Sequence, residues 1–330
     1  MLAGTPNNIH VIDYAVVPGG PVDQKRWQGV ALAFMLSLGF GLGSAFFLEY
    51  LDNSVRTTGD VEKMLHLPAL ASIPSSAGLV RRLLPARLGA LVPRRNGNGH
   101  RPELLIDADA RSPLAEVYRK LRTSVLLSIP KGTPKTLLVT SSLPAEGKTT
   151  TAVNVAISLA QTGAKVIIID ADMRHPQVHN IFQTGNERGL SCILSGDMSE
   201  EEILSVIERD ADTKLHLLPS GPVSPNPAEL LGSDQMRRLV ELLKGTYTHI
   251  VIDSPPVAFF ADSVILATAV DGVLLVVHSG KSSRDVVRSS RQLLQDVSAR
   301  IVGVVLNNVS TPKQDYYYYQ RYYQRYYPQS

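Results

Sequence analysis

Two kinds of hydrophobic pattern divide the chain. Residues 27–48 contain no charged side chain over 22 positions, whereas residues from about 105 to 310 alternate short apolar runs with amphipathic stretches. As a helix, the first segment would span about 33 Å, which is close to the thickness of a membrane hydrocarbon core. Lys25 and Arg26 precede it, and Glu49 follows it. The pattern predicts a transmembrane helix over 27–48.

The second pattern predicts an α/β domain with a mostly parallel sheet. Strands that are apolar on both faces and alternate with helices are typical of a parallel sheet covered by helices on both sides. The expected strands lie at 136–142, 165–172, 214–220, 248–256, 272–279 and 300–308. The expected helices lie near 112–129, 149–161, 234–244, 262–269 and 283–296.

Composition and charge refine this picture at one place. A net charge of +3 is too small to indicate nucleic-acid binding, and no nucleic-acid partner is expected. Between Gly78 and Arg101, however, there are six arginines and no acidic residue. Such a segment either lies on an anionic membrane surface or forms a solvated basic linker, and the sequence leaves both interpretations open. Residues 49–104 are therefore expected to form a juxtamembrane segment and a basic flexible linker.

The segment SSLPAEGKTT (141–150) lies between a predicted strand and a predicted helix, as a phosphate-binding P-loop requires. Gly147 allows the backbone to approach phosphate, Lys148 would neutralise the β- and γ-phosphates of ATP, and the Thr149 hydroxyl would bind Mg²⁺. Ser142 replaces the first glycine of the motif. The expected nucleotide-binding residues are Ala145, Glu146, Gly147, Lys148, Thr149 and Thr150.

Two more predicted strands end in aspartates. VIIIDADMRHP supplies Asp170 and Asp172, which alternate and so point to the same face, and HIVIDSPP supplies Asp253. Ligands of parallel sheets bind at the carboxyl ends of the strands, so we expect these carboxylates beside the P-loop. Asp253 occupies the position of a magnesium ligand in P-loop proteins.

The last sixteen residues, DYYYYQRYYQRYYPQS, contain eight of the twelve tyrosines and no aliphatic residue. Without aliphatic residues this tail is expected to be a mobile arm. Either its rings stack against something, or its hydroxyls are used chemically. The tyrosines are Tyr316, Tyr317, Tyr318, Tyr319, Tyr322, Tyr323, Tyr326 and Tyr327.

The motif DADMRHP resembles the Walker A′ box of the bacterial tyrosine kinases, which are relatives of the MinD and ParA ATPases. PNPAELL (225–231), VIDSPPV (251–257), Asp262 and GVVLNN (303–308) follow in the family's order, and EVYRKLR (116–122) matches its E-x-x-R-x-x-R helix. Upstream, the chain resembles the end of a Wzz-like chain-length determinant with its second membrane helix. The resemblance covers roughly residues 8–327. It implies a MinD/ParA-like P-loop NTPase fold with a deviant Walker motif, preceded by one transmembrane helix.

The resemblance also implies an activity, namely ATP-dependent transfer of a γ-phosphoryl group to tail tyrosines of a neighbouring subunit. Asp170 or Asp172 would accept the hydroxyl proton while the other assists the metal, and the sequence does not separate them. Arg174 would steady the loop or the phosphates, and Asn307 would contact the adenine. The family usually has glycine at Ala145, and alanine is small enough that little change is expected. The expected catalytic residues are Lys148, Asp170, Asp172 and Arg174. The expected magnesium ligands are Thr149, Asp172 and Asp253.

Assembly and location follow from the same resemblance. Glu116, Arg119 and Arg122 are candidate contacts in a homo-oligomeric ring, or they form a solvated helix face. Expected partners are the polysaccharide polymerisation and export machinery and a tyrosine phosphatase. The expected location is the bacterial inner membrane, with the kinase domain in the cytoplasm. The main rival hypothesis is a membrane-tethered MinD/ParA-like ATPase that phosphorylates no tyrosine. A second is a non-enzymatic role, in which a nucleotide-bound ring gates polysaccharide export.

The expected domains reflect what the family contains. They are the end of an extracytoplasmic region (1–26), the transmembrane helix (27–48), the linker (49–104), the kinase domain (105–310) and the tail (311–330). In the family, a first membrane helix and a large extracytoplasmic region precede these parts. We therefore expect a truncated sequence, a split gene or a true short form.

Overall fold

The computed structural model describes residues 26–75, 104, 112–129, 133, 135–196 and 198–310. It divides into two units, Met1–Asp52 and Asn53–Ser330. The predictions for residues 1–25, for the arginine-rich segment and for the tyrosine-rich tail lie outside the described residues.

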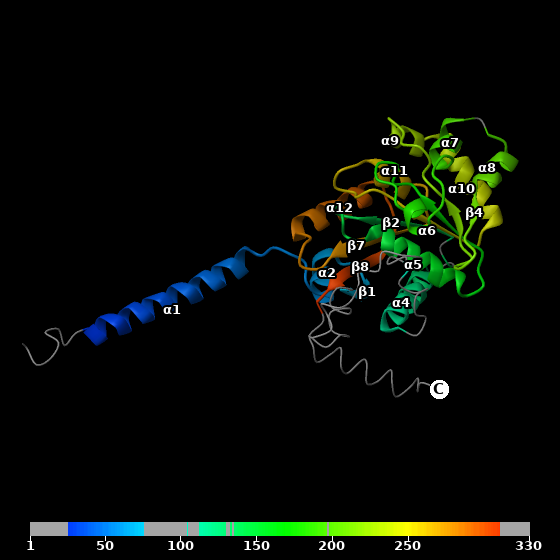
Figure 1. Ribbon diagram of the computed structural model, residues 1–330. Helices are drawn as coiled ribbons and strands as arrows, with labels where there is room; N and C mark the ends of the chain where they lie inside the picture. Colours follow the sequence, from blue (N-terminus) through cyan, green and yellow to red (C-terminus); the bar gives the residue numbers. More distant parts are fainter. Residues whose placement is uncertain are drawn as a thin grey trace, which may run out of the picture. The chain divides into compact units, whose positions relative to one another are not determined.

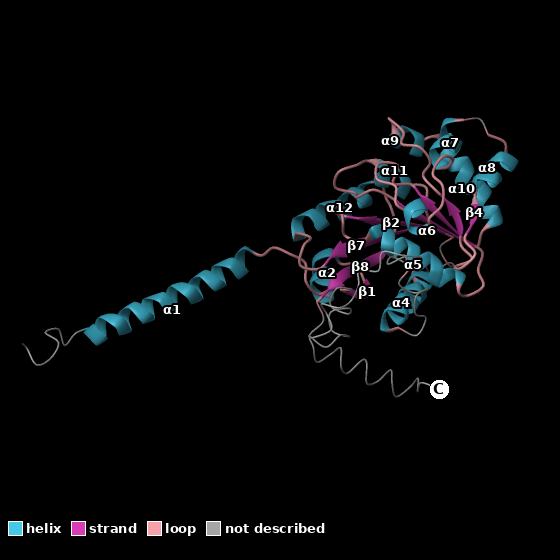
Figure 2. Cartoon of the chain, in the orientation of Figure 1, coloured by secondary structure: helices cyan, strands magenta, loops and turns pink. Residues whose placement is uncertain are grey.

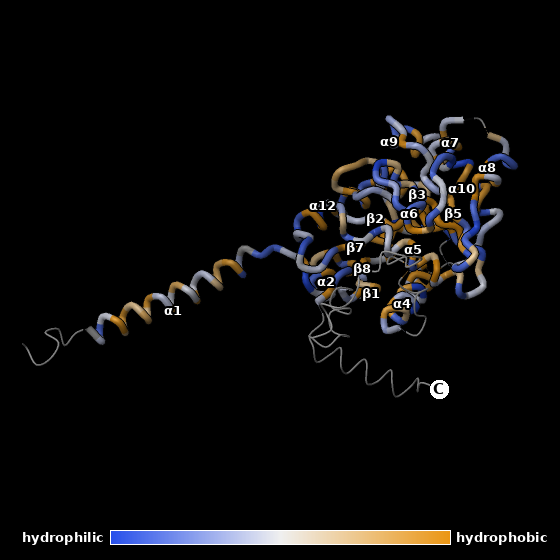
Figure 3. The backbone as a smooth tube through the Cα atoms, in the orientation of Figure 1, coloured by the Kyte–Doolittle hydropathy of each residue, from blue (hydrophilic) through white to orange (hydrophobic). Residues whose placement is uncertain are grey.

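The first unit contains helix α1 (Arg26–Leu51), which confirms the predicted apolar helix. Within it, Trp27–Tyr50 has a mean hydropathy of 2.0, and almost all of its residues are exposed. Figure 3 colours most of this helix orange or pale, without a continuous hydrophilic face. A helix that exposes apolar side chains around its circumference is stable in an apolar surrounding, so α1 is consistent with membrane tethering.

The second unit is built on a mostly parallel sheet, as predicted (Figures 1 and 2). The described residues form eight strands in the order β1-β8-β7-β2-β6-β3-β5-β4, and only the β4–β5 pair is antiparallel. All six predicted strands are present. The strands are β1 (Ala69–Pro74), β2 (Thr136–Ser141), β3 (Val166–Asp170), β4 (Glu208–Arg209), β5 (His216–Leu218), β6 (His249–Asp253), β7 (Gly272–His278) and β8 (Ile301–Val309).

Helices cover both faces of the sheet because successive strand residues point to opposite sides. Leu137 and Val139 of β2 join a core with one group of helices, while Leu138 joins a separate core with another group. The first group is α4 (Pro113–Leu127), α5 (Lys148–Ala160) and α6 (Val178–Phe182). The second group includes α7 (Leu190–Ser195), α8 (Glu200–Val206), α9 (Pro227–Leu231), α10 (Asp234–Thr246), α11 (Asp262–Ala267) and α12 (Arg284–Asp296).

The compact unit begins at Asn53, well before the expected domain start at residue 105. Helix α2 (Thr58–Leu65) begins with a capping box in which Thr57 and Asp60 bond each other's backbone N–H groups. Strand β1 follows and pairs in parallel with β8 at the edge of the sheet. Val61 and Leu65 of α2 are fully buried. Part of the expected linker 49–104 is therefore integral to the α/β fold.

Candidate active site

The predicted P-loop joins β2 to α5 through a turn with two left-handed residues. Gly147 is the N-terminal cap of α5 and has φ 90°, a conformation that favours glycine. Ala145 also has a positive φ, 60°. The family's glycine at this position therefore suits the backbone conformation, and the replacement by alanine concerns the backbone more than side-chain size.

Lys148 lies between carboxylates that come from two other strands. Its Nζ is 2.7 Å from Asp172 Oδ2 and 3.8 Å from Asp253 Oδ2, at the carboxyl ends of β3 and β6. Thr149 Oγ1 donates a hydrogen bond to Asp253 Oδ2 at 2.6 Å. Burial lowers the pKa of Lys148, but the two carboxylates outweigh it and the net pKa is raised. The lysine therefore stays protonated and able to neutralise phosphate charge.

The two aspartates of the DAD motif have different surroundings. Asp170 is fully buried, and its Oδ2 accepts hydrogen bonds from the backbone N–H groups of Gln177 (3.0 Å) and Val178 (2.9 Å). Burial raises the pKa of Asp170 to about 7, and the nearby Asp253 carboxylate adds to the rise. Asp172 instead directs one oxygen to Lys148 and lines the pocket. Of the two aspartates, only Asp172 lines the pocket, and it follows β3, which ends at Asp170.

The residues suit a magnesium ion bound together with phosphate. Asp253 Oδ1 is buried and has no hydrogen-bond partner among the described residues, and burial raises the pKa of Asp253 to about 6. An orphaned carboxylate oxygen beside the Thr149 hydroxyl is a donor set that Mg²⁺ prefers. The described residues hold no cluster of three or more His, Cys, Asp or Glu side chains suited to a metal. Mg²⁺ typically takes only one or two protein ligands and completes its shell with phosphate and water.

Glu146 and Asn307 were both expected to contact the nucleotide, and in the structure their hydrogen bonds stabilise the P-loop. The buried Glu146 carboxyl accepts a hydrogen bond from Ser282 Oγ and one from the Leu143 N–H at 2.9 Å, and burial raises its pKa. Asn307 Nδ2 donates to the Glu146 carbonyl at 2.8 Å. Thr150 lines the pocket as expected.

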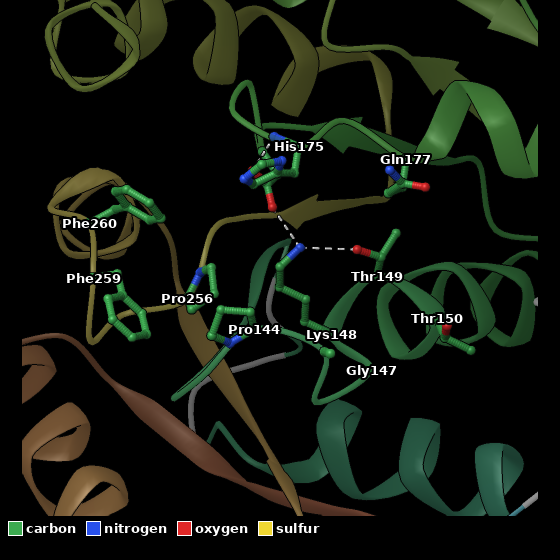
Figure 4. A pocket seen from close by; sticks show the side chains of 12 residues that line it. Pro144, Gly147, Lys148, Thr149, Thr150, His175, Gln177, Pro256, Phe259 and Phe260 are labelled. Carbon is green, nitrogen blue, oxygen red and sulfur yellow. Dashed lines mark hydrogen bonds and ion pairs between the residues drawn. The ribbon is translucent and has the colours of Figure 1, made fainter. Parts of the chain in front are cut away.

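The pocket at this edge has a volume of about 500 Å³ (Figure 4). Charged and polar groups surround Lys148, while prolines and phenylalanines form another part of the lining. Neither phenylalanine was predicted as a site residue, although both come shortly after the DSPP segment (253–256), with only Val257 and Ala258 between. The lining residues are Pro144, Ala145, Gly147, Lys148, Thr149, Thr150, Asp172, His175, Gln177, Pro256, Phe259 and Phe260.

Arg174 lies beside the pocket in a fixed position. Its Nε and Nη2 atoms donate to the two carboxylate oxygens of Asp262 at 2.9 and 3.0 Å, and Asp262 is fully buried. The guanidinium also stacks over the Phe260 ring, 4.3 Å from its centroid. Arg174 thus ties the DAD loop to the start of α11.

The three residues of the E-x-x-R-x-x-R helix lie on α4, away from the pocket lining. Glu116 and Arg119 form an ion pair at 2.7 Å, and Arg122 donates to the Ser158 carbonyl of α5 at 2.8 Å. These contacts lie within one chain, so a role in assembly stays a prediction.

The chain is similar in sequence and in fold to several proteins that are named tyrosine-protein kinases. A family model described as an AAA domain matches residues 145–301. Tyrosine-protein kinase YwqD of Bacillus subtilis is 33% identical over 68% of this chain and 94% of its own length. Tyrosine-protein kinase etk of Escherichia coli is 33% identical over 92% of this chain, which spans only 41% of that protein. The solved kinase domain of the Escherichia coli tyrosine kinase ETK has a TM-score of 0.68 at 30% identity and covers 78% of this chain and 96% of its own.

Proposed function

Because the chain belongs to the bacterial tyrosine kinase family, we propose that it is an ATP-dependent autokinase whose acceptors are its C-terminal tyrosines. The observation that carries this proposal is that Lys148, at the end of the P-loop, lies between the carboxylates of Asp172 and Asp253. A protonated lysine there neutralises γ-phosphate charge, and the backbone N–H groups at the start of α5 bind phosphate oxygens.

The chemistry is transfer of the γ-phosphoryl group from ATP to a tyrosine hydroxyl. The hydroxyl oxygen forms a bond to the γ-phosphorus, and the bond from that phosphorus to the β,γ-bridging oxygen breaks. ADP leaves with the electron pair, and the hydroxyl proton moves to a carboxylate. Such a reaction depends mainly on positioning and charge neutralisation, which the P-loop and Lys148 provide.

We assign the proton acceptor to Asp172. Its carboxylate lines the pocket beside Lys148, whereas Asp170 is enclosed by backbone N–H groups of the loop that follows β3. Asp170 then acts through the loop by fixing the turn that carries Asp172 and His175. Thr149 and Asp253 would hold Mg²⁺, which when bound offsets charge on the β- and γ-phosphates.

The tail and the membrane helix give the proposal its cellular context. Tail tyrosines of one chain would enter the pocket of a neighbour in a ring that uses Glu116, Arg119 and Arg122. Several phosphates, each adding about −1.5 to −2 charge, would repel one another and loosen such a ring. The cellular role would be control of capsule or exopolysaccharide polymerisation and export, reset by a tyrosine phosphatase. Tethering through α1 at the inner membrane would place the kinase domain in the cytoplasm.

The test is mass spectrometry of the C-terminal peptide after the full chain, in detergent micelles, is incubated with magnesium and ATP. We expect phosphate on tyrosines 316–327 in the wild type and none in Lys148→Met. Turnover of ATP with a bare tail would instead support the membrane-tethered ATPase.

A second comparison separates the two aspartates. Asp172→Asn should lower the transfer rate about 10²- to 10⁴-fold while ATP still binds, as expected for loss of a general base. Asp170→Asn keeps one acceptor oxygen, which can still accept from the Gln177 and Val178 N–H groups, and should cost much less. Equal losses in both variants would contradict the assignment of Asp172.

A further inference from the structure

The pocket has two chemically different sides. In Figure 4, Pro144, Pro256, Phe259 and Phe260 lie on one side of Lys148, and Thr149 and Thr150 lie on the other. We call the first group the apolar wall. The polar side begins α5 and suits phosphate, but nothing in phosphate chemistry requires a wall of prolines and phenyl rings.

The apolar wall exposes an aromatic surface. The Phe259 side chain is 60% exposed, although it lies beside a strongly charged centre. Its ring centroid is 6.4 Å from that of Phe260, at an interplanar angle of 50°. Single exposed apolar side chains are common, but here two rings and two prolines line the same pocket and together offer an apolar contact surface.

The second ring is held rigidly from behind. Arg174 stacks over Phe260 at 4.3 Å, and the buried Asp262 fixes that guanidinium with two hydrogen bonds. Phe260 is therefore preorganised, while the exposed Phe259 remains able to close over a ligand. A fixed ring beside a free ring is an arrangement suited to holding a third, planar apolar group.

The in-line geometry of γ-phosphoryl transfer indicates which ligand would contact the apolar wall. The leaving and attacking oxygens lie on opposite sides of the γ-phosphorus. The start of α5, with Thr149 and Thr150, is the side suited to the leaving ADP, so the acceptor would approach from the opposite side of Lys148. The apolar wall occupies that side.

We propose that the apolar wall is the acceptor subsite and binds the phenol ring of the tyrosine that is phosphorylated. This inference rests on the proposed kinase function. The ring packs on Phe259 and Phe260, and the hydroxyl extends toward Lys148 and Asp172. There its oxygen bonds to the γ-phosphorus as ADP departs, and its proton passes to Asp172. Serine and threonine lack a ring to bury, so the wall selects tyrosine.

The experiment uses the full chain in detergent micelles and a synthetic peptide with the sequence of residues 312–330 as the acceptor. Peptide phosphorylation is measured against peptide concentration, and the Kd of a fluorescent ATP analogue is measured separately. For Phe259→Ala we expect the KM for the peptide to rise about tenfold, with restoration toward wild type in Phe259→Tyr. Val223→Ala is the matched control, because Val223 is 70% exposed and lies outside the pocket lining.

The outcomes separate this inference from the function on which it rests. A wild-type chain that never phosphorylates the peptide or its own tail overturns both. A wild-type kinase whose peptide KM is unchanged in Phe259→Ala keeps its function and loses the proposed subsite. A higher Kd for the ATP analogue with an unchanged peptide KM assigns the wall to the adenine base, which also overturns the inference.

Discussion

Replacing Gly147 by alanine tests how tightly the P-loop is built against the end of β8. Gly147 has φ 90°, and a Cβ atom there would overlap Asn307 Nδ2 and lie 3.3 Å from Asn307 Cγ. The Asn307 side chain would have to move, which breaks its 2.8 Å hydrogen bond to the Glu146 carbonyl. We therefore expect Gly147→Ala to destabilise the protein in two ways, through backbone strain at residue 147 and through loss of the hydrogen bond between Asn307 and Glu146.

The magnitude follows from those terms. A left-handed conformation costs an L-residue about 1–2 kcal/mol. The lost hydrogen bond costs about 1 kcal/mol more, and the smaller entropy of the unfolded alanine chain returns about 0.4–1 kcal/mol. The free energy of unfolding should fall by about 2 kcal/mol. Urea unfolding of the full chain in micelles, followed by circular dichroism without nucleotide, measures this change.

A double-mutant cycle isolates the contact between Gly147 and Asn307. In an Asn307→Ala background the obstacle and its hydrogen bond are already absent, so Gly147→Ala should cost only the backbone strain. We expect the two changes to be non-additive by about 1 kcal/mol. An identical cost in both backgrounds, within about 0.5 kcal/mol, would refute the idea that Asn307 braces the loop.

Two further predictions concern buried parts of the fold. Burial raises the pKa of Glu146 above its ordinary value of 4.5. As pH rises past that value the unfolded chain ionises while the folded chain keeps its proton, so wild-type stability should fall with pH. Between about pH 5 and about pH 8, the urea midpoint of unfolding should fall less in Glu146→Gln than in the wild type. If the midpoints of both proteins change equally with pH, Glu146 is already ionised in the folded state. At the β1–β8 pair, a Cβ on Gly303 would lie 2.8 Å from both Leu70 methyl groups, so Gly303→Ala should cost about 1–3 kcal/mol. Adding Leu70→Ala should recover part of that loss, and a Gly303→Ala protein as stable as wild type would show that β1 does not pack there.

Sequence pattern predicted the central strands because each is a run of apolar residues long enough to cross a buried sheet. It missed β1, since ALASIP is short, half-buried and placed after an apolar helix that dominates the local pattern. Only its pairing with β8 makes the segment a strand. Helix α2 was missed for a similar reason, although its capping residues Thr57 and Asp60 are visible in the sequence.

Some features of the candidate site could likewise be predicted from the sequence, and others could not. The P-loop and the aspartates could be predicted because their types and spacing carry the chemistry. The difference between Asp170 and Asp172 could not, because it depends on where the backbone N–H groups of Gln177 and Val178 point after the chain turns. The apolar wall was also hidden, since phenylalanines near a strand end are more often core residues than ligand contacts.

The position of β8 in the sheet sets a length scale for the tail. In a parallel sheet β8 ends at the same edge as β2, and β7 alone separates the two strands, a gap of about 10 Å. Residues 311–330 could extend about 70 Å, several times that gap. On the proposed function, the length of the tail would be sufficient for the chain's own tyrosines to enter its own pocket. Any preference for a neighbour's tyrosines must come from the direction the chain takes after Val309 or from the neighbour's local concentration, and not from tether length.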